Sequence, residues 1–471
     1  MVIKTSRGAP CVVVLAGVLA AAAPSAGQEP LREGAEERIG EIYVPPPSIP
    51  GPITSAAPEG IPAAPPITLA SLEATALAAN PTLRQAVAQV DGTLAKAVQA
   101  GLYPNPVIFY RARQIGVEGT PGEFHGGILR QEIVTAGKLR LSRQKYLART
   151  RTAEWIAMAQ QFRVLNDVRV HFARALGRQE TVAVREQLVR NAEDVVLTTR
   201  EMFNVGQANM ADLHQANALL QRRRLDLQMA RNDLVEARGF LSALVGVELP
   251  PAPLAGTLEG SDGPPLDYNA TLVHLIEHSP EVQQAHAKLG ADRITIDRER
   301  VQPIPNIFVQ GGAGENFEDS PNQVTGMLQV FAEIPLYDRN QGTIRQAQAD
   351  MMRQQGEIRR VELDLRRRFA QEYRRYLTAL QQVENYRSVV LPETRSAYEV
   401  LLKSYQEDRA PWPDVLDAER EYFLRRLEYI AQRIDLNESL ALLEGFLLHD
   451  GLKAPERPTP PGHIDSVPKP R

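Results

Sequence analysis

The chain has 471 residues, a formal net charge of −4 and 6% aromatic residues. A chain of this length would ordinarily hold about three domains. The near-neutral charge and the absence of a basic run give little support to nucleic-acid binding. Cys11 is the only cysteine in the sequence. It lies within residues 1–27, so a chain from which this segment is cleaved has no cysteine and can form neither a disulfide nor a thiolate metal site.

Residues 1–27 have the pattern of an export signal peptide. Lys4 and Arg7 precede the apolar run VVVLAGVLAAAA, and the small residues that follow predict cleavage near Ala26 or Gly27. The run is shorter than the roughly 20 residues of a spanning helix, which disfavours a membrane anchor. No other long apolar run follows. If the exported chain enters a membrane, we therefore expect it to do so through strands.

The sequence is duplicated. NPTLRQAVAQV, followed later by PNPVIF, returns as SPEVQQAHAKL followed by PIPNIF, and the prolines recur at a constant offset. This predicts one structural unit used twice. We expect a first copy at 68–249, a linker at 250–267 and a second copy at 268–452. The proline-rich segments 28–67 and 453–471 are expected to be extended and poorly ordered.

Each copy is expected to open with one helix, at 69–102 and at 269–302, which ends at a proline pair. Alternating segments around a polar loop then predict one hairpin per copy. In PVIFYRARQIG, Arg111 and Arg113 share one face, whereas Ile108, Tyr110 and Ala112 share the other. This alternation suits a polar lumen and a lipid side. Four strands cannot close a barrel, so a membrane-inserted chain must assemble with other copies.

A proline-free stretch begins after the first hairpin, and its composition is typical of long helices. We expect 138–203 to form mostly one helix, roughly 100 Å long, with Gly177 as a candidate break. The next segment has a heptad seam at Leu213, Leu220, Leu227, Leu234 and Leu241. The second copy keeps this seam at Val415, Tyr422, Tyr429, Leu436 and Leu443. The predicted fold is therefore mostly α with a small β part, built from long coiled-coil helices and four strands.

These features resemble a known family, the TolC-like outer-membrane efflux factors. Its motifs are Asn80-Pro81, the Pro104-Asn105-Pro106 turn, their duplicates and the long proline-free helices, and the resemblance covers roughly residues 68–450. The string EIPLYDRNQGTIRQAQAD at 333–350 is similar to the strand-to-helix junction of the cobalt-zinc-cadmium (CzcC-like) branch.

The resemblance implies a homotrimer in the cell outer membrane, with a twelve-stranded barrel among the lipids and a helical tunnel in the periplasm. It implies an outer-membrane channel of a tripartite (RND-type) efflux system, joined to a periplasmic adaptor and an inner-membrane pump. The most favoured cargo is a divalent heavy-metal cation. Two alternatives stay open: efflux of drugs or organic compounds, or type I secretion through the same channel type; and a soluble periplasmic coiled-coil scaffold.

The two helix reversals are the candidate partner-binding tips. FNVGQANMADLHQA resembles the family's periplasmic tip pattern, and its second-copy counterpart is SYQEDRAPWPDVLDAE. The second tip departs from the pattern through Glu407-Asp408 and the inserted Pro411-Trp412-Pro413, which suggests a dedicated partner. By the resemblance, the residues expected to contact a partner are Val205, Gly206, Asp212, Leu213, Asp414, Val415 and Leu416.

No catalytic residue, cofactor site or metal site is predicted. GGAG at 311–314 lacks the Lys-Ser/Thr of a phosphate loop. His274, His278 and His286 are interpreted as an ordinary helix surface, since two ligands on one face are a weak metal signal. Carboxylate rings are a more plausible way to steer cations, although acids at helix starts equally suit N-capping. The candidates are Asp212, Glu407, Asp408, Asp414 and Asp417.

Overall fold

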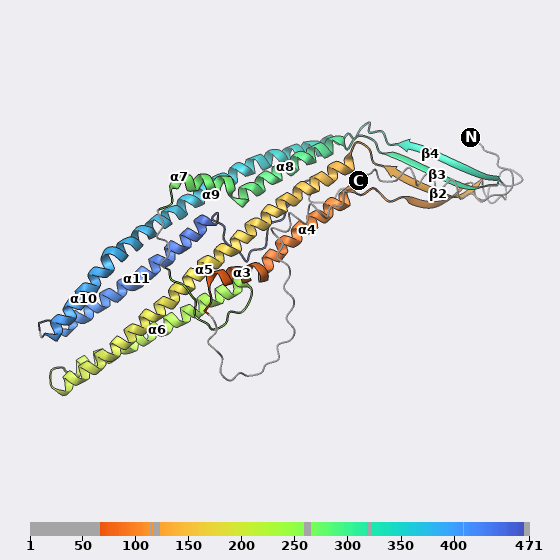
Figure 1. The fold of residues 1–471 in the computed structure, drawn as a ribbon. Coiled ribbons are helices and arrows are strands. Elements are labelled where there is room, and N and C mark those ends of the chain that lie inside the picture. Colours follow the sequence, from red (N-terminus) through yellow and green to blue (C-terminus); the bar gives the residue numbers. More distant parts are fainter. Residues whose placement is uncertain are drawn as a thin grey trace, which may run out of the picture.

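The computed structural model describes residues 66–113, 115, 123–258, 265–317, 323–407 and 409–465. The predicted signal peptide, and all but the last two residues of the proline-rich segment 28–67, lie outside the described residues. The molecule is elongated, with the strands at one end and both helix reversals at the other (Figure 1).

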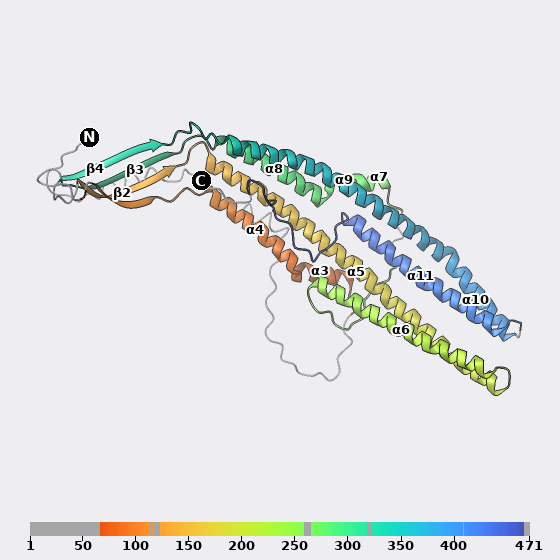
Figure 2. The same ribbon diagram turned by 180° about the vertical axis from the view of Figure 1, so that it is seen from behind.

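Each copy contributes two short helices, one hairpin and one long helical arm, and the two arms run side by side (Figures 1 and 2). The first copy holds α3 (Leu69–Ala79), α4 (Pro81–Gly101), β1 (Val107–Arg113), β2 (Phe124–Ile133), α5 (Lys138–Asn204) and α6 (Met210–Val245). The second holds α7 (Tyr268–His278), α8 (Pro280–Val301), β3 (Ile307–Asn316), β4 (Gln323–Ala332), α9 (Gln341–Asn385), the π-helical turn η2 (Tyr386–Val390), α10 (Leu391–Gln406) and α11 (Trp412–Glu444). The predicted duplicated, mostly helical fold is confirmed.

The long helix predicted after the first hairpin is confirmed, but its expected break is wrong. Helix α5 runs for 67 residues without interruption. A Cβ atom on Gly177 would lie 2.3 Å from Ile434 Cδ1 of α11. Glycine at this position therefore lets α11 approach α5 closely and does not end the helix.

The single opening helix predicted in each copy is wrong, because a proline divides it. Asn80 precedes Pro81 in an extended conformation that proline imposes on its neighbour, and Ser279 does the same before Pro280. Asn80 is fully buried; its Oδ1 accepts from the Thr82 backbone N–H at 2.9 Å, and its Nδ2 donates to the Leu244 carbonyl at 2.8 Å. The bend thus caps α4 and fastens it to the end of α6.

The two predicted hairpins form one antiparallel sheet with the order β1-β2-β3-β4. Central pairs such as Tyr110 with Gly127 and Gly312 with Met327 fix the register. Large apolar side chains alternate along the two outer strands and are exposed, with Ile108 at 80%, Tyr110 at 68%, Leu328 at 73% and Val330 at 61%. The outer strands therefore present apolar side chains to their surroundings.

Most positions of the two predicted heptad seams are buried, and Leu213, Leu234 and Tyr422 are half-buried. In α6, Leu220, Leu227 and Leu241 are at most 9% exposed, and they face α5. In α11, Val415, Tyr429, Leu436 and Leu443 are equally covered. The charged residues off the α6 seam are not merely solvated, since several pair with α5: Arg185 with Asp226, Glu193 with Arg224, and Glu186 with Arg231.

The expected linker and the C-terminal tail are both packed against the helices where the structure describes them. In the expected linker, Ala252 and Leu254 are buried in the first-copy core, and Leu254 forms a β-bridge with Ile67. The prediction of a poorly ordered tail is wrong for 453–465, because His463 and Asp465 are buried against both copies. Proline content correctly excluded regular helix here, but it gave no information on whether the extended chain finds a groove.

Among the described residues, no helix is both long enough and apolar enough to cross a membrane.

Candidate functional site

The first tip is a tight reversal between α5 and α6. Gly206 adopts φ = 76°, a left-handed conformation that glycine adopts without a steric penalty. A side chain built there would meet nothing within 4 Å, and the neighbouring Val205 is 69% exposed. The tip therefore has an open backbone and exposes apolar side chains, with Met210 at the start of α6 53% exposed.

A reciprocal capping box fixes the start of α6. Asn209 Oδ1 accepts from the Asp212 backbone N–H at 3.0 Å, and Asp212 Oδ2 accepts from the Asn209 N–H at 2.9 Å. Asn209 is thus the N-cap residue, and Asp212 takes part in capping as the third residue of the helix, which agrees with the capping interpretation of Asp212. The role of Asn209 was not predicted, although Asn-x-x-Asp before an apolar run is a capping signal. Leu213, the residue after Asp212, is half-buried.

The second tip is held by packing instead of side-chain capping. Trp412, the first residue of α11, lies 4.7 Å from the ring of Tyr405, and no side-chain cap bond precedes it. Asp414 is exposed in the first turn of α11. Val415, predicted to contact a partner, is only 1% exposed and belongs to the core in this conformation. Leu416 is half-buried against α5 and α6.

The carboxylates proposed to steer cations have different surroundings. Glu407 forms an ion pair with Arg409. Asp417 is exposed at the rim of a cavity of about 180 Å³ between α5, α6 and α11, which is also lined by Arg223, Glu419 and Arg420. Asp408 lies outside the described residues. Asp212 and Asp414 lie in the first turns of α6 and α11.

Near the tips, an apolar cluster joins the two arms. Ala192, Val195, Val196, Ala216 and Leu220 form its buried part, and Trp412 and Leu416 pack on it. Beside this cluster, Asn191 Nδ2 donates to Glu419 Oε1 at 2.6 Å. Burial raises the pKa of Glu419 above its usual value, and the contacts with Asn191 and Arg223 only partly oppose this. The second tip is therefore attached to the first-copy arm.

Farther from the tips, a buried carboxylate links three helices. Glu438 of α11 has a side chain only 3% exposed and pairs with Arg174 of α5 and with Arg375 of α9, the latter at 2.9 Å. Arg433 Nη1 on α11 lies 3.0 Å from Glu180 Oε2 on α5. The sequence analysis missed these links, because each partner looks like an ordinary helix-surface charge until the helices are placed together.

Two of the histidines pack against each other on α7. The rings of His274 and His278 stack with centroids 4.6 Å apart, and His278 Nδ1 faces the His274 carbonyl at 3.2 Å. Across the described ranges, no group of three or more His, Cys, Asp or Glu side chains is arranged to hold a metal ion.

Comparisons with known proteins identify the family. The model of the family "Outer membrane efflux protein" matches residues 72–247 and 271–447, so it matches the chain twice. The chain belongs to the outer membrane efflux protein family. As a TolC-like channel protein it is not an enzyme, and it resides in the outer membrane with its helices extending into the periplasm.

Two curated relatives of this efflux protein are informative. "Cobalt-zinc-cadmium resistance protein CzcC" of Cupriavidus metallidurans is 25% identical over 78% of this chain and 87% of the relative. "Toluene efflux pump outer membrane protein TtgF" of Pseudomonas putida is 23% identical over 63% of this chain and 62% of the relative.

Two solved structures share the fold. The MtrE outer-membrane channel of Neisseria gonorrhoeae, in its open state, is 19% identical with a TM-score of 0.63, covering 82% of this chain and 90% of MtrE. CusC is 18% identical with a TM-score of 0.65, covering 81% of this chain and 92% of CusC. The fold expected from the motifs is confirmed.

Proposed function

We propose that this efflux protein is the outer-membrane subunit of a tripartite, RND-type system that exports divalent heavy-metal cations from the periplasm to the exterior. The family match supports the efflux channel itself. The observation that supports the tripartite assembly is the separation of two surfaces. The outer strands β1 and β4 expose apolar side chains at one end of the molecule, and the two helical tips lie at the other end. The sheet suits a lipid environment and the tips suit a periplasmic adaptor.

The unpaired sheet edges support assembly of the chain with further copies of itself. Within the described residues, β1 pairs only with β2 and β4 only with β3, so each subunit keeps two free edges. Exposed backbone donors and acceptors are not tolerated in hydrocarbon. Pairing β1 of one subunit with β4 of the next subunit would close twelve strands from three chains and satisfy both edges.

The metal cargo is supported by CzcC, the relative with the broader coverage, and by the DRNQG junction. In that junction Asn340 adopts φ = 59°, and its Nδ2 donates to the Glu299 carbonyl at 2.9 Å and to Glu299 Oε2 at 2.8 Å. The motif therefore fastens the start of α9 to the end of α8. These contacts are structural, so the junction supports common ancestry with the metal branch more than it supports a particular cargo.

Gene deletion and complementation test the cargo. We expect the deletion strain to lose tolerance to zinc, cobalt or cadmium while tolerance to toluene and a panel of drugs stays unchanged, and the wild-type gene to restore it. Unchanged metal tolerance combined with increased sensitivity to organic compounds would contradict the metal assignment and favour the TtgF-like alternative.

Fractionation tests the assembly separately from the cargo. We expect the protein in the outer-membrane fraction as a trimer that dissociates only on heating in detergent. Recovery solely in the soluble periplasmic fraction as a monomer would contradict the channel and support the scaffold alternative.

A further inference from the structure

The chain after α11 turns back along α5 toward the strands. Gln160 Nε2 donates to the carbonyls of Gly451 and Lys453, at 2.8 and 3.2 Å. Twelve residues after Gly451, His463 contacts Arg149 of α5. Asp465 then contacts Lys145, in the second turn of α5. Residues 453–465, the C-terminal strap, therefore follow α5 for about four of its turns.

The strap contacts both copies. On the first-copy side, Gln89 Nε2 of α4 donates to the Pro455 carbonyl at 3.4 Å. On the second-copy side, Gln284 Nε2 of α8 donates to Glu456 Oε2 at 2.9 Å. The Ile464 N–H donates to Asp350 of α9 at 3.3 Å. Helices α4 and α8 both pack on α5 and lie on opposite sides of it (Figure 1). The strap therefore connects the helices on the two sides of α5.

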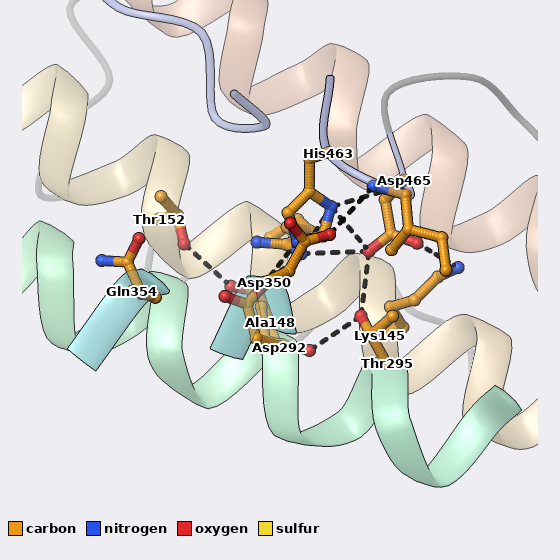
Figure 3. A network of polar contacts seen from close by, with 12 residues as sticks. Lys145, Ala148, Thr152, Asp292, Thr295, Asp350, Gln354, His463 and Asp465 are labelled. Atoms are coloured by element: carbon orange, nitrogen blue, oxygen red, sulfur yellow. Dashed lines mark hydrogen bonds and ion pairs between the residues drawn. The ribbon is translucent and has the colours of Figure 1, made fainter. Parts of the chain in front are cut away.

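A buried charged cluster seats the end of the strap (Figure 3). Arg149 Nη2 lies 2.6 Å from Asp292 Oδ1 and 3.0 Å from Asp465 Oδ2, and these three side chains are at most 4% exposed. Lys145 Nζ lies 2.9 Å from Asp465 Oδ1. Two cations from α5 thus meet one carboxylate from α8 and one from the strap.

His463 and Thr295 complete the cluster. His463 Nδ1 accepts from the Asp465 N–H at 3.0 Å, while its Nε2 lies 3.0 Å from Asp292 Oδ1, so the ring is oriented by both carboxylate-bearing residues. Thr295 Oγ1 of α8 lies 2.9 Å from Asp465 Oδ2. Burial disfavours the charge on Asp465, but Lys145 and Arg149 outweigh it and lower its pKa to about 2.

We propose that residues 453–465 are a conformational strap that fixes the spacing of α4 and α8 across α5, and that the Arg149–Asp292–His463–Asp465 cluster is its lock. A passive tail would be expected to make exposed, replaceable contacts. This one places a carboxylate between two buried cations of the first copy and hydrogen-bonds a helix of the second. Removing one member leaves the others buried without compensation, so the lock is cooperative.

The first test is hydrogen exchange on the purified full-length protein in detergent. Asp465→Asn and His463→Gln are expected to increase amide exchange in α4 and in α8 by about 10-fold or more, because unseating the strap lowers the local opening free energy. Peptides from the tips, in α6 and α10, should exchange at wild-type rates. Arg457→Gln is the matched control, since this exposed side chain lies in the strap but outside the lock.

The second test measures spacing directly. Lys96 of α4 and Arg293 of α8 are both exposed. Spin labels attached to the cysteines of a Lys96→Cys, Arg293→Cys variant report the α4–α8 distance. We expect one narrow distance distribution in the otherwise wild-type protein and a broad one after Asp465→Asn. A chain ending at residue 452 should behave like Asp465→Asn, and a synthetic peptide of 453–471 should narrow its distribution again, whereas the peptide with the Asp465→Asn change should not.

Each outcome decides the proposal. Wild-type exchange and spacing in both lock variants would overturn it. Uniformly faster exchange that includes the tips would also overturn it, because the cluster would then contribute only to general stability. If the truncated chain does not accumulate, the two point variants and their control still decide.

Discussion

The long helical arms of the two copies have the same plan but different structures. Helix α5 is continuous over 67 residues and packs on α4, α6, α8 and α11. In the second arm the π-helical turn Tyr386–Val390 precedes α10, and no α10 residue is buried among those described. Pro392 explains the irregularity, because it has no N–H to donate to the carbonyl of Ser388. Helix α5 of the first copy therefore lies at the centre of the subunit, whereas α10 of the second copy lies at its edge.

The tips differ in the same way. The first is defined by glycine and a capping box, which are local backbone devices. The second is defined by Trp412 packing on Tyr405 and on the first-copy cluster, which is a tertiary device. The two copies have kept the same path of the chain, but the interactions that stabilise their helix reversals have diverged.

The largest expected effect tests where the copies are still equivalent. Leu241→Ala in α6 and Leu443→Ala in α11 change the same seam position, at 0% and 2% exposure. Each is expected to lower the free energy of unfolding by about 2–5 kcal/mol, measured by chemical denaturation in detergent. Leu225→Ala, 67% exposed, is the control and should change it by less than about 0.5 kcal/mol. A large effect at only one seam position would show that the seams are not equivalent.

The next prediction concerns the second tip alone. Trp412→Ala should lower local stability by about 2 kcal/mol, because the contact with Tyr405 and the cluster is lost. Trp412→Phe keeps the ring contact and removes a buried indole N–H that has no partner among the described residues, so it should be neutral or slightly stabilising. Exchange rates of amides in α10 and α11 measure both. Destabilisation by Phe equal to that by Ala would refute the packing explanation.

The third prediction uses the pH dependence of the strap. The pKa of Asp465 is lowered from 3.8 to about 2, so its carboxylate stabilises the fold above pH 3.8. By linkage this contribution is roughly 2 kcal/mol and is lost as the pH falls through about 2. The stability difference between wild type and Asp465→Asn should therefore be constant from pH 5 to 7 and shrink on acidification. A difference that does not change with pH would contradict it.

The smallest effects separate the two ways of starting a helix. Asn209→Ala should cost about 1 kcal/mol at the first tip, because it removes the capping box. Asp414→Asn should cost only about 0.3–1 kcal/mol, since its carboxylate acts on the dipole of α11 without a cap bond. Local hydrogen exchange at each tip is the measurement. If Asp414→Asn proves the more damaging change, the second tip depends on a charge contact that its helix position does not predict.

Local features explain what could be predicted. The heptad seams and the alternating strands each depend on neighbours within a few residues, and most seam positions and both hairpins were confirmed. Where prediction failed, the deciding partner lay far along the chain. Gly177 reads as a helix breaker until Ile434 is placed against it, and the proline-rich strap reads as disordered until Arg149 and Lys145 are seen at its end.

The sequence by itself therefore determined the duplicated plan, the long helices, the strand pairs and the family, since periodicity and proline position act locally. Only the tertiary structure decided which long helix lies at the centre, how Asn80 and Trp412 are used, and that the C-terminal strap binds both copies. The physical reason is that a buried charge or a close helix approach is favourable only when two distant surfaces meet. A single sequence does not state which surfaces those are.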